Sequence, residues 1–180
     1  NVTLIDLNNP ENNIFQVTEE WTQKGVIVKN RADVIFLING IPVAIAEAKG
    51  ERKTDGLALG INQIRRYHSQ TPEILTFPQL FEVTELWNFW YGLTWNTNRK
   101  NLFEWKIKQD DSIQEGDYEQ KIKTFFDKQR FLKVLRYYIV FLDRDDGLTK
   151  VVLRQHQTRA GEKVIERIQD TTKKKGLVWH

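Results

Sequence analysis

An Asn-Gly pair at positions 39–40 separates two runs of strand-forming residues. Residues 32–38 and 41–47 are both rich in Val, Ile and other apolar side chains. Asn-Gly between two such runs is the strongest short-range signal for a β-hairpin. The sequence therefore predicts an antiparallel pair of strands here.

This hairpin carries three residues with chemical potential. Asp33 begins the first strand, and Glu47 and Lys49 end the second. Alternate residues of a strand share a face, so Glu47 and Lys49 are predicted to project together, with Val43 and Ile45 behind them. The small residues Ala44, Ala46 and Ala48 then take the other face.

The length of the turn decides whether Asp33 joins Glu47. A two-residue loop pairs Asp33 with Ala46 and places it on the wrong face, whereas a three-residue loop with Gly40 in a bulge shifts the register by one. We expect the odd-length loop, which brings Asp33 to the face of Glu47. The same register gathers four apolar residues below the acids: Ile35, Leu37, Val43 and Ile45.

Two carboxylates and a lysine at strand ends suit metal-dependent phosphodiester cleavage. Hard oxygen ligands bind Mg²⁺, which activates water and offsets the charge that develops on the phosphate. The lysine can orient or deprotonate that water, or stabilise the transition state. Spacing alone also fits an exposed ion pair at a sheet edge, so this alternative stays open.

A helix is predicted over residues 56–69, because apolar residues recur at 57, 61 and 64. Gln63 and Tyr67 lie at i and i+4 and therefore share one face of it. Gly56 and Gly60 fall on the same face, which would let the helix approach a sheet or a phosphate backbone closely. Taken singly, Gln63 and Tyr67 also fit ordinary polar residues at the edge of a core.

Six stretches now make the chain recognisable, because it resembles the N-terminal nuclease region of type I restriction enzyme R subunits (HsdR). This region is similar to the PD-(D/E)xK nucleases that add a QxxxY motif. In chain order the stretches are ENNIFQV (11–17), NRADVIFLINGIPVAIAEAKG (30–50), INQIRRYHSQTPEILTFPQLFEVT (61–84), FFDKQRFLKVLRYYIVF (125–141), RQHQTRAGEKVIERI (154–168) and GLVWH (176–180).

The resemblance implies a role for each motif residue. It assigns Asp33, Glu47 and Lys49 to the D…ExK triad, and Gln63 with Tyr67 to QxxxY. It further implies that Asp33, Glu47 and Ala48 hold Mg²⁺. The proline that usually precedes the first aspartate is Ala32 here, which matters little because the acid does the chemistry.

The resemblance also implies a fold and a domain order. The fold class is α/β, a restriction-endonuclease-like mixed sheet flanked by helices, with a helical C-terminal extension leading to a helicase motor. Residues 1–108 would form the nuclease core, 109–148 the helical extension and 149–180 the start of the ATP-dependent motor. Gln157 would be the adenine-contacting glutamine, although no GxxxxGK[ST] loop occurs in the chain. ATP is therefore expected only in the complete subunit.

Periodicity and turn residues predict the remaining elements. Helices are expected over 118–142, divided in two if the stripe breaks, and over 157–170 with Ala160, Val164 and Ile168 on one face. Strands are expected at 15–21, 80–86, 89–95, 103–107 and 150–154.

Composition limits the alternatives. The chain has no Cys, which excludes disulfides and thiolate zinc sites, and it has no membrane-length apolar run. Its first residues have no basic and no apolar segment, so we expect no signal peptide and a cytoplasmic protein. The 27 basic and 24 acidic residues give a net charge of only +3, too mild to indicate nucleic-acid binding by itself. Arg65, Arg66 and the charged loop at 49–53 are candidate contacts to DNA phosphates.

The predicted function is Mg²⁺-dependent, non-sequence-specific cleavage of double-stranded DNA after ATP-driven translocation. The expected partners are DNA and the methyltransferase (M) and specificity (S) subunits of a restriction complex, with no membrane. Two alternatives remain: a different D…ExK nuclease acting in DNA repair or on junctions, and a catalytically inert module that binds DNA or docks the motor.

Overall fold

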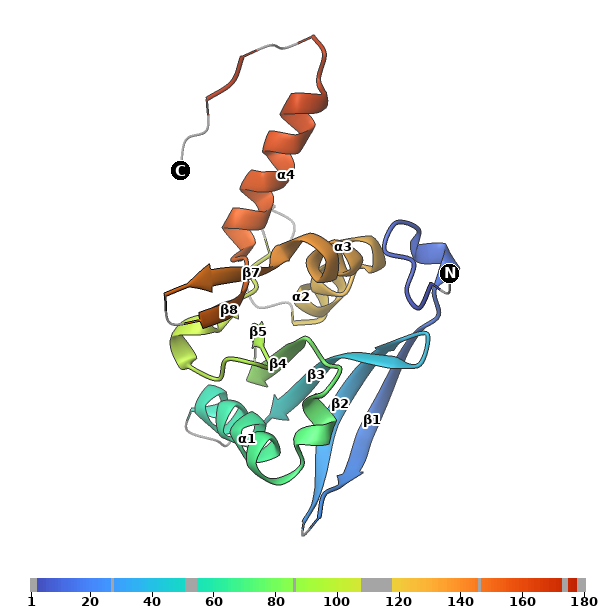
Figure 1. Cartoon of the computed structure of the whole chain (residues 1–180), viewed down its shortest axis with the longest axis vertical. Helices are drawn as coiled ribbons and strands as arrows, with labels where there is room; N and C mark the ends of the chain where they lie inside the picture. The colour runs from blue at the N-terminus through green and yellow to red at the C-terminus, as the bar shows by residue number, and fades with distance from the viewer. Residues whose placement is uncertain are drawn as a thin grey trace.

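A computed structural model gives the arrangement of the chain and describes residues 3–26, 28–50, 55–85, 87–107, 118–145, 147–172 and 175–177. Its elements are drawn in Figure 1. The strands are β1 (Phe15–Lys24), β2 (Lys29–Ile38), β3 (Ile41–Lys49), β4 (Leu80–Glu85), β5 (Asn88–Leu93), β6 (Phe103–Glu104), β7 (Ile139–Arg144) and β8 (Gly147–Val152). The helices are α1 (Gly56–Gln70), α2 (Tyr118–Phe125), α3 (Lys128–Lys133) and α4 (Gln155–Gln169).

In the described part of the chain, six strands form one mixed sheet in the order β1-β2-β3-β4-β5-β6, and β7 pairs with β8 in a second sheet. Neighbouring strands of the large sheet are antiparallel except β3 and β4, which run parallel. A parallel pair needs a crossover, and α1 supplies it. The predicted α/β class with a mixed sheet flanked by helices is confirmed.

The β2–β3 turn differs from the prediction, although the register of the two strands beyond it agrees with the prediction. The turn is a two-residue loop, with φ of 53° at Asn39 and 80° at Gly40, as a primed hairpin turn requires. Leu37 pairs with Pro42 but Phe36 pairs with Ala44, so a β-bulge rather than an odd-length loop shifts the register. Proline has no N–H to donate to the ladder and is tolerated at bulges, which explains this position.

Because of the bulge, the apolar face of the hairpin differs from the prediction. The extra residue between Pro42 and Ala44 is Val43, and it packs on the opposite side of the sheet from Ile35, Leu37 and Ile45. Only three of the four expected residues therefore lie below the acids.

Helix α1 covers one face of the sheet. Its buried stripe includes Leu57, Ile61 and Ile64, as the spacing predicts, and packs in a core with residues of β2, β3 and β4. A Cβ at Gly60 would lie 2.5 Å from the Cγ atoms of Val83 on β4. The glycine therefore allows the close approach of helix to sheet that the sequence predicts.

Helices α2 and α3 belong to the opposite face, where an aromatic core includes Phe89, Tyr91, Phe125 and Phe131. The predicted helix over 118–142 is wrong beyond residue 138. A π-helical turn, η4 (Val134–Tyr138), is followed by strand β7, which pairs with β8 across the predicted domain boundary at 148–149. Ile139, Val140 and Phe141 are β-branched or aromatic residues that favour a strand once a partner strand is available.

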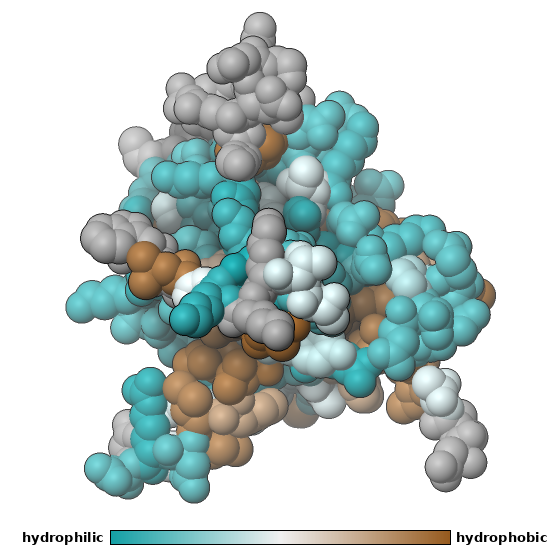
Figure 2. Space-filling model, turned by 90° about the horizontal axis from the view of Figure 1, so that it is seen from above, coloured by the Kyte–Doolittle hydropathy of each residue, from teal (hydrophilic) through white to brown (hydrophobic). Residues whose placement is uncertain are grey.

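Helix α4 projects away from the rest of the molecule (Figure 1). Its expected apolar residues are largely uncovered: Val164 is 36% exposed and Ile168 77%. Viewed from this end, the surface is mainly hydrophilic with separate hydrophobic patches (Figure 2). Among the described helices, none has the length and apolarity to span a membrane.

Candidate active site

Asp33, Glu47 and Lys49 meet on the face of the sheet that α1 covers. Val34 pairs with Ala46, so Asp33 lies opposite Glu47 in the register, as predicted. Glu47 is fully buried, whereas the side chains of Asp33 and Lys49 are 32% and 13% exposed. The sheet therefore presents one enclosed and one accessible carboxylate at the same place.

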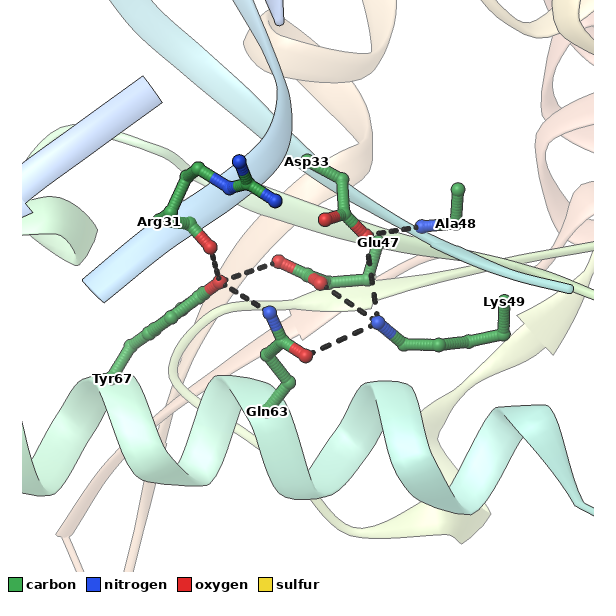
Figure 3. Close-up of polar contacts among 7 residues, drawn as sticks. All are labelled: Arg31, Asp33, Glu47, Ala48, Lys49, Gln63 and Tyr67. Atoms are coloured by element: carbon green, nitrogen blue, oxygen red, sulfur yellow. Dashed lines mark hydrogen bonds and ion pairs between the residues drawn. The ribbon is translucent and has the colours of Figure 1, made fainter. Parts of the chain in front are cut away.

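The ammonium group of Lys49 links the network (Figure 3). Its Nζ lies 3.0 Å from Glu47 Oε2 and 3.5 Å from Asp33 Oδ2. It also donates to Gln63 Oε1 at 3.1 Å. Because these acceptors come from two strands and a helix, Lys49 is held at the point where all three elements meet.

Tyr67 completes the network from the next turn of α1. Gln63 Nε2 donates to the Tyr67 hydroxyl at 2.7 Å. That hydroxyl lies 2.8 Å from Glu47 Oε1 and 2.7 Å from the carbonyl oxygen of Arg31. The predicted shared face of Gln63 and Tyr67 is confirmed, and it is turned toward the carboxylates.

Burial sets the protonation of this network. It raises the pKa of Glu47 from its ordinary value of 4.5 to about 7, although Lys49 opposes the rise. Burial, with Glu47 nearby, also raises the pKa of Tyr67, which therefore remains a phenol. The phenol has one proton for two acceptors. A proton on Glu47 Oε1 would resolve this, because Glu47 would then donate to Tyr67 and Tyr67 to Arg31.

The donor set fits a magnesium ion of the kind that keeps several waters. Asp33 and Glu47 provide hard oxygens, and Asp33 Oδ2 accepts from the Ala48 N–H at 2.9 Å, so the main chain of Ala48 lies against the same carboxylate. Among the described residues, no group of three or more His, Cys, Asp or Glu side chains could hold a metal. A metal here would therefore use these two carboxylates and water, and the family resemblance adds the main chain of Ala48.

The other predicted residues lie outside this network. Gln157 is in the first turn of α4, where its side-chain oxygen accepts from the Arg154 N–H at 2.8 Å. Arg65 donates hydrogen bonds to Asn62 Oδ1 and to the carbonyl oxygen of Thr97. Of the predicted loop at 49–53, residues 51–53 fall outside the described residues, so their DNA contacts stay predictions.

Sequence reasoning missed two main-chain groups of the site. The carbonyl of Arg31 accepts from Tyr67, and the N–H of Ala48 donates to Asp33. Side-chain patterns do not show such contacts. The alternation of β2 does carry a signal for Arg31, because it lies two residues before Asp33 and shares its face.

Fold and site together define an α/β domain with a D…ExK and QxxxY constellation beside a parallel strand pair. A sequence model of the family described as type I restriction enzyme R protein N terminus (HSDR_N) matches residues 1–100. The chain therefore belongs to this family. Its mixed sheet flanked by helices is consistent with the restriction-endonuclease-like fold.

Similar proteins extend the match over nearly the whole chain. A putative type I restriction enzyme MjaVIIP endonuclease subunit from Methanocaldococcus jannaschii is 32% identical over 98% of this chain and 18% of its own length. The type I restriction enzyme EcoprrI endonuclease subunit from Escherichia coli is 29% identical over 99% of this chain and 57% of its own length. The type I restriction enzyme SauCOLORF180P endonuclease subunit from Staphylococcus aureus is 26% identical over 93% of this chain and 18% of its own length. The chain thus spans between 18% and 57% of the length of these relatives.

Proposed function

We propose that this chain is the nuclease domain of a type I restriction enzyme R subunit and hydrolyses phosphodiesters of double-stranded DNA with Mg²⁺. The observation that carries the proposal is the position of Lys49. Its ammonium contacts both Asp33 and Glu47 and is held by Gln63. Burying a lysine between two carboxylates, one of them fully buried, costs desolvation free energy, so stability alone does not explain the arrangement. A metal-dependent nuclease, by contrast, uses all three groups.

Asp33, Glu47 and the main-chain oxygen of Ala48 would hold the metal. When bound, Mg²⁺ activates a water and offsets negative charge on the phosphate. Glu47 must release the proton that burial favours before it can act as an anionic ligand.

Lys49 is the group placed to act on the reacting atoms. Its ammonium can orient the attacking water or stabilise charge on the pentavalent phosphorus centre. Gln63 holds the ammonium through its oxygen, while its amide nitrogen donates to Tyr67. Tyr67 in turn braces Glu47 and the main chain of β2. Gln63 and Tyr67 are therefore positioning residues, because a neutral amide and a phenol are poor Mg²⁺ ligands.

The larger context is also part of the proposal. Cleavage would not depend on sequence, because contacts to phosphates position a duplex without reading its bases. The M and S subunits would supply target recognition, and an ATP-driven motor, with Gln157 at its adenine site, would supply translocation. The names of the relatives, which are endonuclease subunits of type I restriction enzymes, support this context.

The two alternatives are less well supported. The family match favours restriction over a repair or junction nuclease. An inert docking module has no need for a connected network of Asp33, Glu47, Lys49, Gln63 and Tyr67, and the complete set is present.

The test is Lys49→Ala in the complete enzyme, with DNA cleavage and ATP hydrolysis measured on the same samples. We expect cleavage to fall by about 10²- to 10³-fold, the size of losing one charge-stabilising donor, with ATP hydrolysis unchanged. Lys128→Ala, an exposed lysine on α3, is the matched control and should cleave normally. Normal cleavage by Lys49→Ala would overturn the proposal.

A further inference from the structure

Arg31 places an exposed cation beside the candidate active site. It lies two residues before Asp33 on β2, and alternate residues of a strand share a face. Its side chain is 58% exposed, and Figure 3 shows it extending on the Asp33 side of the network. Lys49, by contrast, is committed to two carboxylates and an amide.

The main chain of Arg31 is fixed relative to the catalytic groups. Its carbonyl oxygen lies 2.7 Å from the Tyr67 hydroxyl, which also contacts Glu47. The network therefore fixes the position from which the Arg31 side chain extends. A ligand bound by the guanidinium would have a defined position relative to Glu47 and Lys49.

Glu20 holds the guanidinium from the neighbouring edge strand. Its Oε1 lies 2.8 Å from Arg31 Nη1, and its side chain is 65% exposed. Glu20 has a φ of 54°, and the pairing of β1 with β2 skips it opposite Asp33. Left-handed backbone at a non-glycine residue is unfavourable and tends to occur at functional sites, whereas an exposed ion pair adds little stability. Stability alone therefore does not account for this arrangement.

We propose that Arg31 binds a backbone phosphate of duplex DNA next to the scissile one, and that Glu20 holds the guanidinium in place until the phosphate displaces it. This inference rests on the proposed function and names a substrate contact of the same site. A guanidinium presents a planar fork of donors that matches two phosphate oxygens, and phosphate is a natural replacement for the carboxylate of Glu20. Arg31 thereby aligns the strand over Lys49 without reading sequence.

The experiment measures binding of the chain to a short DNA duplex by fluorescence anisotropy, with Ca²⁺ in place of Mg²⁺ and at several salt concentrations. We expect Arg31→Ala to weaken binding about tenfold, the loss of a charged hydrogen-bonded contact. The slope of log K against log salt should become shallower by about one, because one phosphate contact is lost. Arg144→Ala, an exposed arginine at the end of β7, carries the same charge change and should leave the slope as in the wild type.

Glu20→Gln separates a phosphate contact from general charge effects. It should strengthen DNA binding in the wild-type background and have a smaller effect in the Arg31→Ala background, because Glu20 acts through Arg31. Equal effects in both backgrounds, or an Arg31→Ala slope equal to that of Arg144→Ala, would overturn the inference.

Different results would contradict the Arg31 contact and the proposed nuclease function. If Arg31→Ala lowered only the unfolding midpoint and left DNA binding unchanged, the pair with Glu20 would be structural and this inference wrong, while the proposed function would stand. If the wild-type chain bound no duplex even at low salt, this inference would be wrong as well, whereas the proposed function fails only if Lys49→Ala cleaves normally in the complete enzyme.

Discussion

Glu47 and Glu82 are both fully buried, and they lie on opposite faces of the same sheet on neighbouring strands. Glu47 has an ammonium and a phenol as partners. Among the described residues, neither oxygen of Glu82 has a hydrogen-bond partner. Burial raises the pKa of both carboxyl groups above the ordinary value. Burial and a raised pKa therefore do not by themselves mark a functional site; the partners do.

The largest expected difference is between amide substitutions at the two glutamates. Glu47→Gln should reduce DNA cleavage by the complete enzyme about 10³-fold, because a metal-holding charge is lost next to Lys49. Glu82→Gln should cleave like the wild type, since its side chain faces the aromatic core. The measurement is plasmid cleavage with ATP hydrolysis as the internal reference. Equal losses at both positions would remove the distinction drawn between the two faces.

Removing a single partner of Glu47 should have an intermediate effect. Tyr67→Phe and Gln63→Ala should each reduce cleavage by about 10- to 100-fold, the usual cost of losing support for a metal-site ligand, with translocation unchanged. Cleavage and translocation are measured separately on the same preparation. Unchanged cleavage in both variants would return Gln63 and Tyr67 to ordinary polar residues at the edge of a core.

Glu82 should be replaceable by an apolar residue with a gain in stability. Glu82→Leu removes a buried carboxyl that has no partner among the described residues, and we expect the free energy of unfolding to rise by about 2 kcal/mol. Urea denaturation near neutral pH measures the change. A loss of stability would mean that Glu82 has a partner that matters to the fold.

The raised pKa of Glu47 predicts that the stability of the fold depends on pH, and we expect this effect to be smaller than those of the substitutions above. Between its ordinary value of 4.5 and about 7, the folded chain holds a proton that the unfolded chain has released. The free energy of unfolding should therefore fall as pH rises through this window, by a contribution that is fully present below pH 4.5 and lost above about 7. Glu47→Gln should lack this contribution. Identical pH profiles for wild type and variant in metal-free buffer would contradict the assignment.

The periodicities of helices and strands predict which side chains share the site better than they predict the turn and the bulge that bring the strands into register. Helical spacing places Gln63 and Tyr67 on one face, and strand alternation places Glu47 beside Lys49; both are local periodicities. The register of Asp33 depends on a bulge at Val43, for which the signal is Pro42 rather than the Asn-Gly turn. The prediction reached the correct face for Asp33 through the wrong turn.

The failures arise where distant residues decide the structure. Ile139 continues a helical stripe in sequence, but pairing with Val152 makes it a strand. Val164 and Ile168 fall on a predicted helix face that remains exposed. Arg31 carries no motif, and its place in the site depends on a carbonyl contact with Tyr67, 36 positions away. The predicted domain boundaries and the adenine contact of Gln157 stay predictions.

Iron-directed cleavage of the chain tests whether Asp33 and Glu47 share a divalent metal. Fe²⁺ substituted for Mg²⁺, with ascorbate and peroxide, generates radicals that cut the main chain close to the bound ion, and mass spectrometry locates the cuts. We expect cuts in β2 near Asp33 and in β3 near Glu47 and Ala48, suppressed by excess Mg²⁺ and absent in Asp33→Asn. Cuts elsewhere, or the same cuts in Asp33→Asn, would contradict it.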